Sequence, residues 1–195
     1  MRSRLAAAVM LLGATWASVR ADGEEKATAE DAAVVSAAVQ HFGSEKDAPS
    51  FAGREGKTSV LVHTESAGPA ALYLSDDQIR ADTAGEKWEV PTELRESLRK
   101  RNAAKVPLAG LTLGRGVVAA DLDKALAPRD WEGPEKYSDA RAFARVWLPA
   151  YSKDGRTAVV RFAFGPTAHG ATATYLLTKA EGGWKVTKWK LAYYA

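Results

Sequence analysis

Apolar residues near the start of the chain follow the rhythm of a helix. Four of them recur at the i, i+3, i+4, i+7 spacing that places side chains on one helix face: Val35, Ala38, Val39 and Phe42. Thr28 and Asp31 have the spacing of a capping box, and Gly43 follows the last apolar position. The pattern predicts an amphipathic helix of about four turns, followed by a loop over residues 43–57.

The middle of the chain carries shorter signals. The β-prone run from Thr58 to His63 predicts a strand. Ser75 and Gln78 are spaced to cap a short helix, and Pro91 marks the first turn of another helix that ends at the basic residues 99–101. Residues 117–122 favour a strand, and a helix through residue 125 is an alternative for the same segment.

The last quarter of the chain alternates in the period of a β-sheet. Four β-prone runs are separated by turn residues and predict an antiparallel meander: 141–151, 156–164, 171–179 and 184–193. In the second run the even positions are apolar and are expected to face the core, as in a half-buried sheet: Ala158, Val160, Phe162 and Phe164.

The final run changes phase in its middle. Trp184 and Val186 are out of step with the later positions Trp189, Leu191 and Tyr193. This predicts a bulge near residues 187–188, and bulges bend sheets. We therefore expect an α+β fold in which N-terminal helices pack on a curved antiparallel sheet that ends in a four-stranded meander.

The first 21 residues have the composition of a secretory signal peptide. Arg2 and Arg4 precede a 15-residue apolar run, and Ala21 ends the segment. The run is shorter than the roughly 20 apolar residues of a membrane-spanning helix, so we expect cleavage, export to the periplasm or the medium, and no transmembrane span. Residues 22–195 are then expected to form one α+β domain.

Removal of the signal changes the charge balance. The whole chain has 27 Lys and Arg against 24 Asp and Glu, and the signal contains three arginines and no acidic residue. The remainder is formally neutral, which weakens the case for a nucleic-acid partner. The chain contains no cysteine, so neither disulfide bonds nor a lipidated cysteine is expected.

Several segments of the C-terminal half together resemble a group of uncharacterised exported bacterial proteins. These segments are the run from Tyr151 to Val160, Phe164-Gly-Pro, His169-Gly-Ala, Tyr175-Leu-Leu-Thr-Lys and Gly183-Trp-Lys-Val. More loosely, a leading helix and a closing meander are similar to the nuclear-transport-factor-2-like (cystatin-like) α+β roll. That roll hosts isomerases, dehydratases, hydrolases and binding modules, so the resemblance implies a fold more than a function.

Two glycine motifs imitate nucleotide-binding loops. Residues 51–58 end in Gly-Lys-Thr, but Phe51 occupies the position of the first glycine and no strand precedes it. Gly114 and Gly116 match the residue pattern of the dinucleotide-binding fingerprint, but Pro128 leaves no room for the long helix that must follow. We interpret both motifs as turns and expect no cofactor.

Metal ligands are few. His63 and Glu65 lie on one strand face, and Asp121 and Asp123 have the same spacing, but a zinc site needs three or four ligands. We therefore expect no metal.

The remaining candidates are ligand-binding residues. The loop 165–170 contains His169, which titrates near neutral pH. The other candidates are Arg161, Trp147, Tyr175 and Asp139. No complete catalytic set is present, so we expect a non-catalytic domain that binds a small molecule or an envelope protein. An isomerase-type or hydrolase-type enzyme that uses the sheet concavity, with His169 as acid or base, is the alternative.

Overall fold

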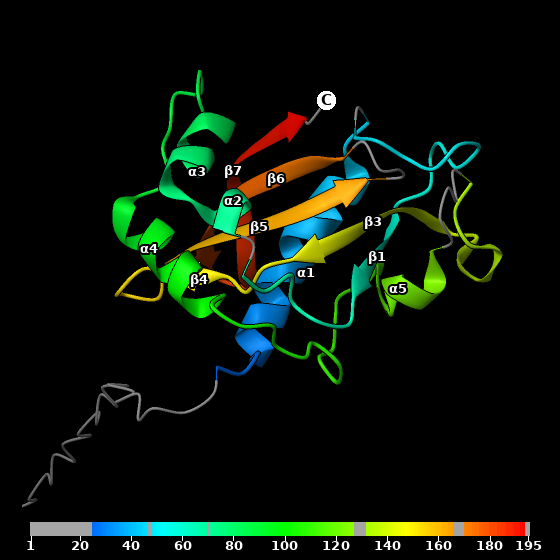
Figure 1. The fold of residues 1–195 in the computed structure, drawn as a ribbon, viewed down its shortest axis with the longest axis horizontal. Coiled ribbons are helices and arrows are strands. Elements are labelled where there is room, and N and C mark those ends of the chain that lie inside the picture. The colour runs from blue at the N-terminus through cyan, green and yellow to red at the C-terminus, as the bar shows by residue number, and fades with distance from the viewer. Residues whose placement is uncertain (1–24, 47, 70, 127–131, 166–169, 194–195) are drawn as a thin grey trace, which may run out of the picture.

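The computed structural model describes residues 25–46, 48–69, 71–126, 132–165 and 170–193. They form one seven-stranded sheet with helices on both faces (Figure 1), which confirms the α+β prediction. The strands are β1 (Ser59–His63), β2 (Val117–Ala120), β3 (Ala140–Val146), β4 (Ala150–Tyr151), β5 (Thr157–Gly165), β6 (Ala171–Ala180) and β7 (Gly183–Tyr193). The helices are α1 (Ala29–Ser44), α2 (Ala71–Leu74), α3 (Asp76–Asp82), α4 (Thr92–Arg101), α5 (Leu122–Ala125) and the 3₁₀ turn η1 (Glu135–Tyr137).

The sheet is mixed. Its order is β2-β1-β3-β5-β6-β7, and β4 pairs with β5 beside β3. The strands β3, β5, β6 and β7 form the expected antiparallel meander. β1, however, runs parallel to both of its neighbours, β2 and β3. The amino ends of these three parallel strands therefore lie at the same edge of the sheet.

Helix α1 begins and packs as its sequence predicts. The Thr28 hydroxyl accepts a hydrogen bond from the Asp31 amide (3.2 Å), and the Asp31 carboxylate accepts one from the Thr28 amide (2.8 Å). Phe42 is fully buried between Phe162 and Phe164, with ring centroids 5.6 and 4.3 Å away. Burial of one such side chain contributes about 1.5–3 kcal/mol, so this face fixes α1 on the sheet.

The bulge in the last strand lies where the phase change predicts it. Leu176 is paired with Lys188 and Leu177 with Val186, so Thr187 has no partner in the register. The bulge brings Trp184 and Val186 onto the same face as Trp189, next to α1. Without the extra residue, one half of β7 would turn its apolar side chains away from the core.

The expectation of a half-buried β5 needs correction. Its first face is buried under α1 as predicted, but Val159 and Arg161 on the second face are also fully buried. Helices α2, α3 and α4 cover this side (Figure 1), and Val159 packs in one cluster with Ile79 and Leu98. The sheet is thus the middle of three layers, because helices that come much earlier in the chain than β5 return to cover it.

Two predicted segments are each divided in two. The run from Arg141 to Tyr151 forms β3 and β4, with Pro149 in the break, where proline has no N–H to donate to a ladder. The segment after Val117 forms a strand and then a helical turn, because the Asp121 side chain accepts a hydrogen bond from the Lys124 amide and caps α5.

Within the described residues, no helix has the length and apolar character required to cross a bilayer.

Candidate functional site

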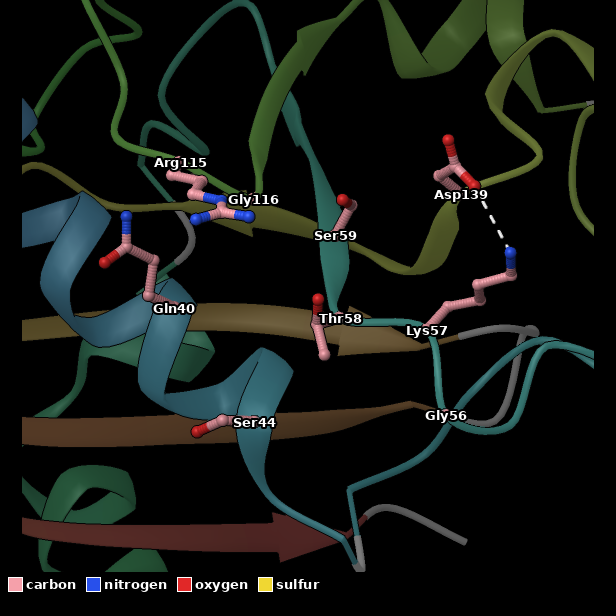
Figure 2. Close-up of a pocket in the computed structure, with 9 residues that line it drawn as sticks. All are labelled: Gln40, Ser44, Gly56, Lys57, Thr58, Ser59, Arg115, Gly116 and Asp139. Carbon is pink, nitrogen blue, oxygen red and sulfur yellow. Dashed lines mark hydrogen bonds and ion pairs between the residues drawn. The ribbon is translucent and has the colours of Figure 1, made fainter.

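The two glycine motifs of the sequence lie side by side at the amino ends of β1 and β2. Together with the last turns of α1 they enclose a groove of about 610 Å³ (Figure 2), which we name the α1 groove. It is lined by Gln40, Ser44, Gly56, Lys57, Thr58, Ser59, Arg115, Gly116 and Asp139. Neither motif has the structure of a nucleotide-binding loop, because each leads directly into a strand.

The first wall of the groove is held by a very close backbone approach. Gly43 of α1 lies against the segment that enters β1, and a Cβ atom on Gly43 would be 2.2 Å from the Thr58 carbonyl oxygen. Only glycine permits this distance without a shift of the backbone. The guanidinium of Arg141 in β3 also donates to the Gly43 carbonyl oxygen (3.0 Å), which fixes the end of α1 on the sheet.

The second wall is fixed to α1 in the same way. The Gly114 amide donates to the Ser36 hydroxyl (2.8 Å), and a Cβ atom on Gly114 would be 2.4 Å from the Gln40 side-chain amide. Gly116 follows with a φ of 80°, a left-handed conformation that favours glycine. Both loops are therefore held by α1 in one arrangement, as expected of a preformed binding site.

The groove is polar, and its lining has more positive than negative side chains. Lys57 and Asp139 form an ion pair at 3.2 Å on one side. On the other side Arg115 lies above Gln40, with Thr58 and Ser59 between the two sides (Figure 2). Within the described part of the chain the Arg115 guanidinium makes no hydrogen bond or ion pair. Its five N–H donors are accordingly available to a carboxylate or a phosphate.

Asp139 is the predicted candidate that the structure places in this groove. Its side chain is 84% exposed, and Lys57 is its only ionic partner among the described residues. No sequence pattern joins Asp139 to Arg115, because they come from loops that precede different strands. The only trace of the groove in the sequence is the pair of glycine motifs. Such motifs indicate that the backbone packs closely against another part of the protein, but they do not identify that part.

Three other candidates occupy the core. Arg161 is fully buried, donates to Thr174 (2.7 Å) and is ion-paired with Asp82 of α3. Trp147 is buried and donates its indole N–H to the Gly68 carbonyl oxygen (3.0 Å). Tyr175 is fully buried and stacks between Phe162 and Trp189. Each of these side chains has a structural partner.

His169 lies outside the described residues, and so does most of the loop that contains it. The enzymatic alternative depends on this histidine. In the lining of the α1 groove, all of which is described, there is no histidine, cysteine or nucleophile–base pair.

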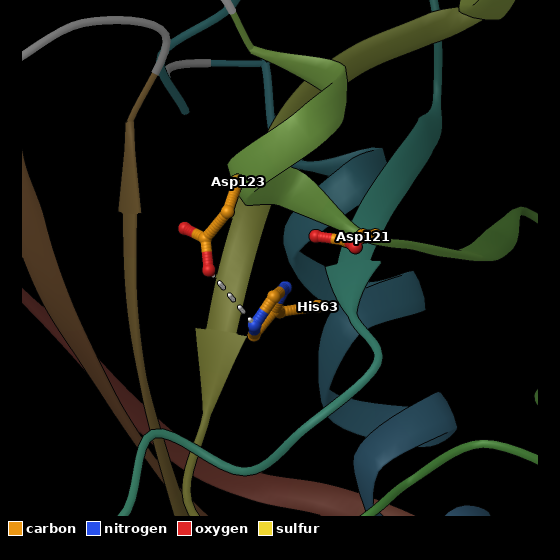
Figure 3. Close-up of side chains that lie close together, drawn as sticks. All are labelled: His63, Asp121 and Asp123. Atoms are coloured by element: carbon orange, nitrogen blue, oxygen red, sulfur yellow. Dashed lines mark ion pairs between the residues drawn. The ribbon is translucent and has the colours of Figure 1, made fainter.

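The structure also brings one residue of the first predicted metal-ligand pair, His63, to both residues of the second. His63, Asp121 and Asp123 lie together where β1 and β2 end (Figure 3), with one ligand atom of each within 4.8 Å of the others. Glu65, the other half of the predicted pair, is not part of this group. Three ligands in one place are the minimum for a catalytic zinc site.

The protonation of His63 argues against a metal at this place. Its Nδ1 accepts a hydrogen bond from the Leu122 backbone amide (3.1 Å). A backbone N–H can only donate, so Nδ1 carries no proton and the neutral ring carries it on Nε2, which lies 3.7 Å from the Asp123 carboxylate. A metal on Nε2 would have to displace this proton, so the geometry favours a structural role for His63 at the start of α5.

The two carboxylates already have cationic partners. The hydrogen bond and charge of Arg145, 2.6 Å away, lower the pKa of Asp123, and those of Lys124 lower the pKa of Asp121. The three-residue cluster is thus part of a network that ties β1, α5 and β3 together. We regard the α1 groove as the better candidate for binding.

Comparison with known proteins gives no family or relative. No protein-family model, no curated protein and no solved structure matches this chain. The function must accordingly be argued from the geometry of the groove.

Proposed function

We propose that the protein is an exported, non-catalytic binding domain whose α1 groove holds a small anionic ligand that also carries hydroxyl groups. One observation carries the proposal: the Arg115 guanidinium has no partner among the described residues and lies in a groove whose walls are fixed by glycine contacts with α1. An arginine in such a position offers bidentate hydrogen bonds to a carboxylate or a phosphate.

The size and lining of the groove support this class of ligand. A volume of about 610 Å³ is in the range of small-molecule sites. Thr58 and Ser59 supply hydroxyl groups that can both donate and accept, and the Ser44 hydroxyl, which donates to the His41 carbonyl oxygen (2.8 Å), supplies an acceptor. The ion pair of Lys57 and Asp139 adds a donor and an acceptor at the far side. These groups suit the hydroxyls of a sugar acid or a phosphorylated polyol.

The lining also supports binding without catalysis. A covalent or acid–base mechanism requires a nucleophile or a titrating group that is positioned by a second residue. Asp139 is the only carboxylate in the lining, and its partner is Lys57 rather than a hydroxyl that it could activate as a nucleophile. A binding protein needs no more than the donors and acceptors that the groove presents.

The proposal is tested by thermal unfolding in the presence of defined probes. Glycerol 3-phosphate and gluconate are expected to raise Tm, because a ligand that binds only the folded state stabilises it by mass action. Glucose, which is neutral, should shift Tm much less. Arg115→Gln should abolish the response to both anions, whereas Arg99→Gln, the same change at an exposed position on α4, should leave it intact.

Two results would count against the groove. If no anion shifts Tm at any concentration up to the solubility of the probe, the ligand class is wrong. If the shift persists in Arg115→Gln, the anion binds elsewhere. Export is tested separately, because N-terminal sequencing of protein recovered from the cell envelope or medium should begin at Asp22.

A further inference from the structure

β7 is an edge strand of the sheet, with no described strand on its outer side, and it is unusually long. It spans Gly183–Tyr193, 11 residues, and among the described strands it pairs only with β6. The opposite edge strand, β2, has four residues. Of the devices that commonly protect sheet edges, β7 has lysines and one bulge, but it is neither short nor interrupted by proline. Its backbone N–H and C=O groups on the outer side therefore have no partner strand among the described residues.

The two faces of β7 differ sharply in chemistry. On the face toward α1 lie Trp189, Leu191 and Tyr193, and Tyr193 is 63% exposed, the highest value for a large apolar side chain in the described residues. With Glu45 and Ala48 of the α1 end, Glu86 and Lys190, these three residues line a groove of about 400 Å³. Lys190 points to the face of β7 opposite to that of Trp189, Leu191 and Tyr193. The groove therefore passes around the outer edge of the strand.

The other face of β7 is basic. Lys185, Lys188 and Lys190 are paired in register with Thr178, Leu176 and Thr174, and so share the face that α3 approaches. Lys190 is neutralised by Glu86 at 2.6 Å. Lys185 and Lys188 have no ion-pair partner in the described part of the chain. β7 itself contains no acidic residue.

We propose that β7 binds an extended segment of a partner protein by strand addition, and that this segment alternates apolar and acidic residues. An added strand would pair with the β7 backbone, and its successive side chains would point alternately to the two faces. Apolar side chains would contact Trp189, Leu191 and Tyr193. Acidic side chains on the other face would lie opposite Lys190, Lys188 and, nearer the start of β7, Lys185, of which Lys190 is already paired with Glu86. This surface is separate from the α1 groove.

Charge selects this occupant over a second copy of the same chain. Two β7 strands paired edge to edge would bring their lysines onto neighbouring positions of one sheet face, and like charges on neighbouring strands are destabilising. An acidic partner removes this repulsion and gains complementary pairs. Lysines on an edge also discourage unspecific strand pairing, so an acidic partner would be selected while neutral strands are refused.

The test uses fluorescence anisotropy of a peptide that carries the dye on its amino end, fluorescein-Gly-Gly-Val-Glu-Val-Asp-Phe-Glu-Val-Glu-Val-amide, in which the nine residues after Gly-Gly are long enough to pair from Tyr193 to Lys185. The proposal expects saturable binding that weakens with salt, since the charge pairs are exposed. Two versions of the peptide, N-methylated at the apolar or at the acidic residues, block opposite edges of the strand and keep the side chains, so the version that blocks the edge facing β7 should lose binding. A peptide with lysine in place of the acidic residues should not bind.

Variants of the protein test whether the peptide binds at β7. The double variant Lys185→Glu/Lys188→Glu should bind the acidic peptide about tenfold more weakly and the lysine peptide more tightly. The matched control Lys100→Glu/Lys136→Glu changes the net charge equally at exposed positions outside β7 and should bind the acidic peptide nearly as the parent protein does. An unchanged Tm in each double variant shows that the fold is retained.

Three results would overturn the proposal. The first is the absence of binding by the parent protein. The second is undiminished binding of both N-methylated peptides, which would mean that side chains bind without strand addition. The third is a concentration-dependent dimer in analytical ultracentrifugation that Tyr193→Ser dissociates, which would assign the edge to a second copy of the chain.

Discussion

Asp31 and Arg101 form a buried ion pair that joins the first turn of α1 to the last turn of α4, with Oδ1 2.8 Å from Nη1. The same carboxylate accepts a hydrogen bond from the Tyr151 hydroxyl (2.8 Å), and the Glu25 carboxylate accepts one from Nε of Arg101 (2.6 Å). Burial would raise the pKa of Asp31, but the hydrogen bond and charge of Arg101 outweigh it and hold the pKa below its ordinary value. The pair therefore connects the helices on opposite faces of the sheet.

Replacement of Arg101 by methionine should destabilise the protein strongly. Loss of one partner leaves the Asp31 carboxylate buried without a counter-charge, and such changes cost about 3–5 kcal/mol. Urea unfolding followed by circular dichroism measures the effect. Arg99→Met, two residues earlier on the same helix but exposed, is the control and should change stability by less than about 0.5 kcal/mol. Similar values for both variants would contradict the role of the pair.

Acid should weaken the protein through the same carboxylate. The pKa of Asp31 is lower in the folded protein than its ordinary value of 3.8, so the folded state binds fewer protons in this range. The stabilisation is complete above pH 3.8 and is lost as the pH falls through the lower folded pKa. Asp31→Asn should be less stable at neutral pH and should show a flatter loss of stability in acid. Parallel pH profiles of the two proteins would show that other groups control acid unfolding.

Two glycines at the α1 groove should respond differently to alanine. Gly43→Ala places a Cβ 2.2 Å from a backbone oxygen, so it should destabilise by about 1–3 kcal/mol although alanine favours helices. Gly114→Ala meets mainly the flexible Gln40 amide, and Gln40→Ala should relieve part of its cost. Chemical denaturation of the single and double variants measures both. A stable Gly43→Ala protein would contradict the close approach.

The buried pair of Arg161 and Asp82 should be structural. Arg161 is fully buried, and its removal leaves Asp82 without its charge partner, so Arg161→Met should cost several kcal/mol, about 3–5. Arg161→Met combined with Asp82→Leu should recover much of this loss, because no buried charge remains. Denaturation curves of the parent protein and of these two variants measure both effects. No recovery in the double variant would indicate that Arg161 acts through other contacts as well.

Zinc should leave the protein unchanged at the cluster of His63, Asp121 and Asp123. Nδ1 of His63 is an acceptor for the Leu122 amide, so a metal on Nε2 would have to displace the ring proton. A stoichiometric excess of ZnCl₂ should therefore not raise Tm, and EDTA should not lower it. His63→Ala should reduce stability to the same extent with and without zinc. A zinc-dependent rise in Tm that is lost in His63→Ala would reverse this assignment.

The local sequence determined the elements that depend on neighbours in the chain. The capping box of Thr28 and Asp31, the apolar stripe up to Phe42 and the phase change in β7 each correspond to a feature of the structure. Their information is local, because helix caps need residues three apart and strand faces need residues two apart. The four-stranded meander follows from the same rule, since each turn joins strands that then pair.

Only the tertiary structure decided which distant segments meet. The parallel pairing of β1, the helical cover over Arg161 and the α1 groove, with Arg115 facing Lys57 and Asp139, each join residues far apart in the sequence. No periodicity records such contacts, because they depend on how buried surfaces pack around one core. The sequence thus determined the helix and the bulged meander, and three-dimensional packing determined the groove and left β7 as a sheet edge.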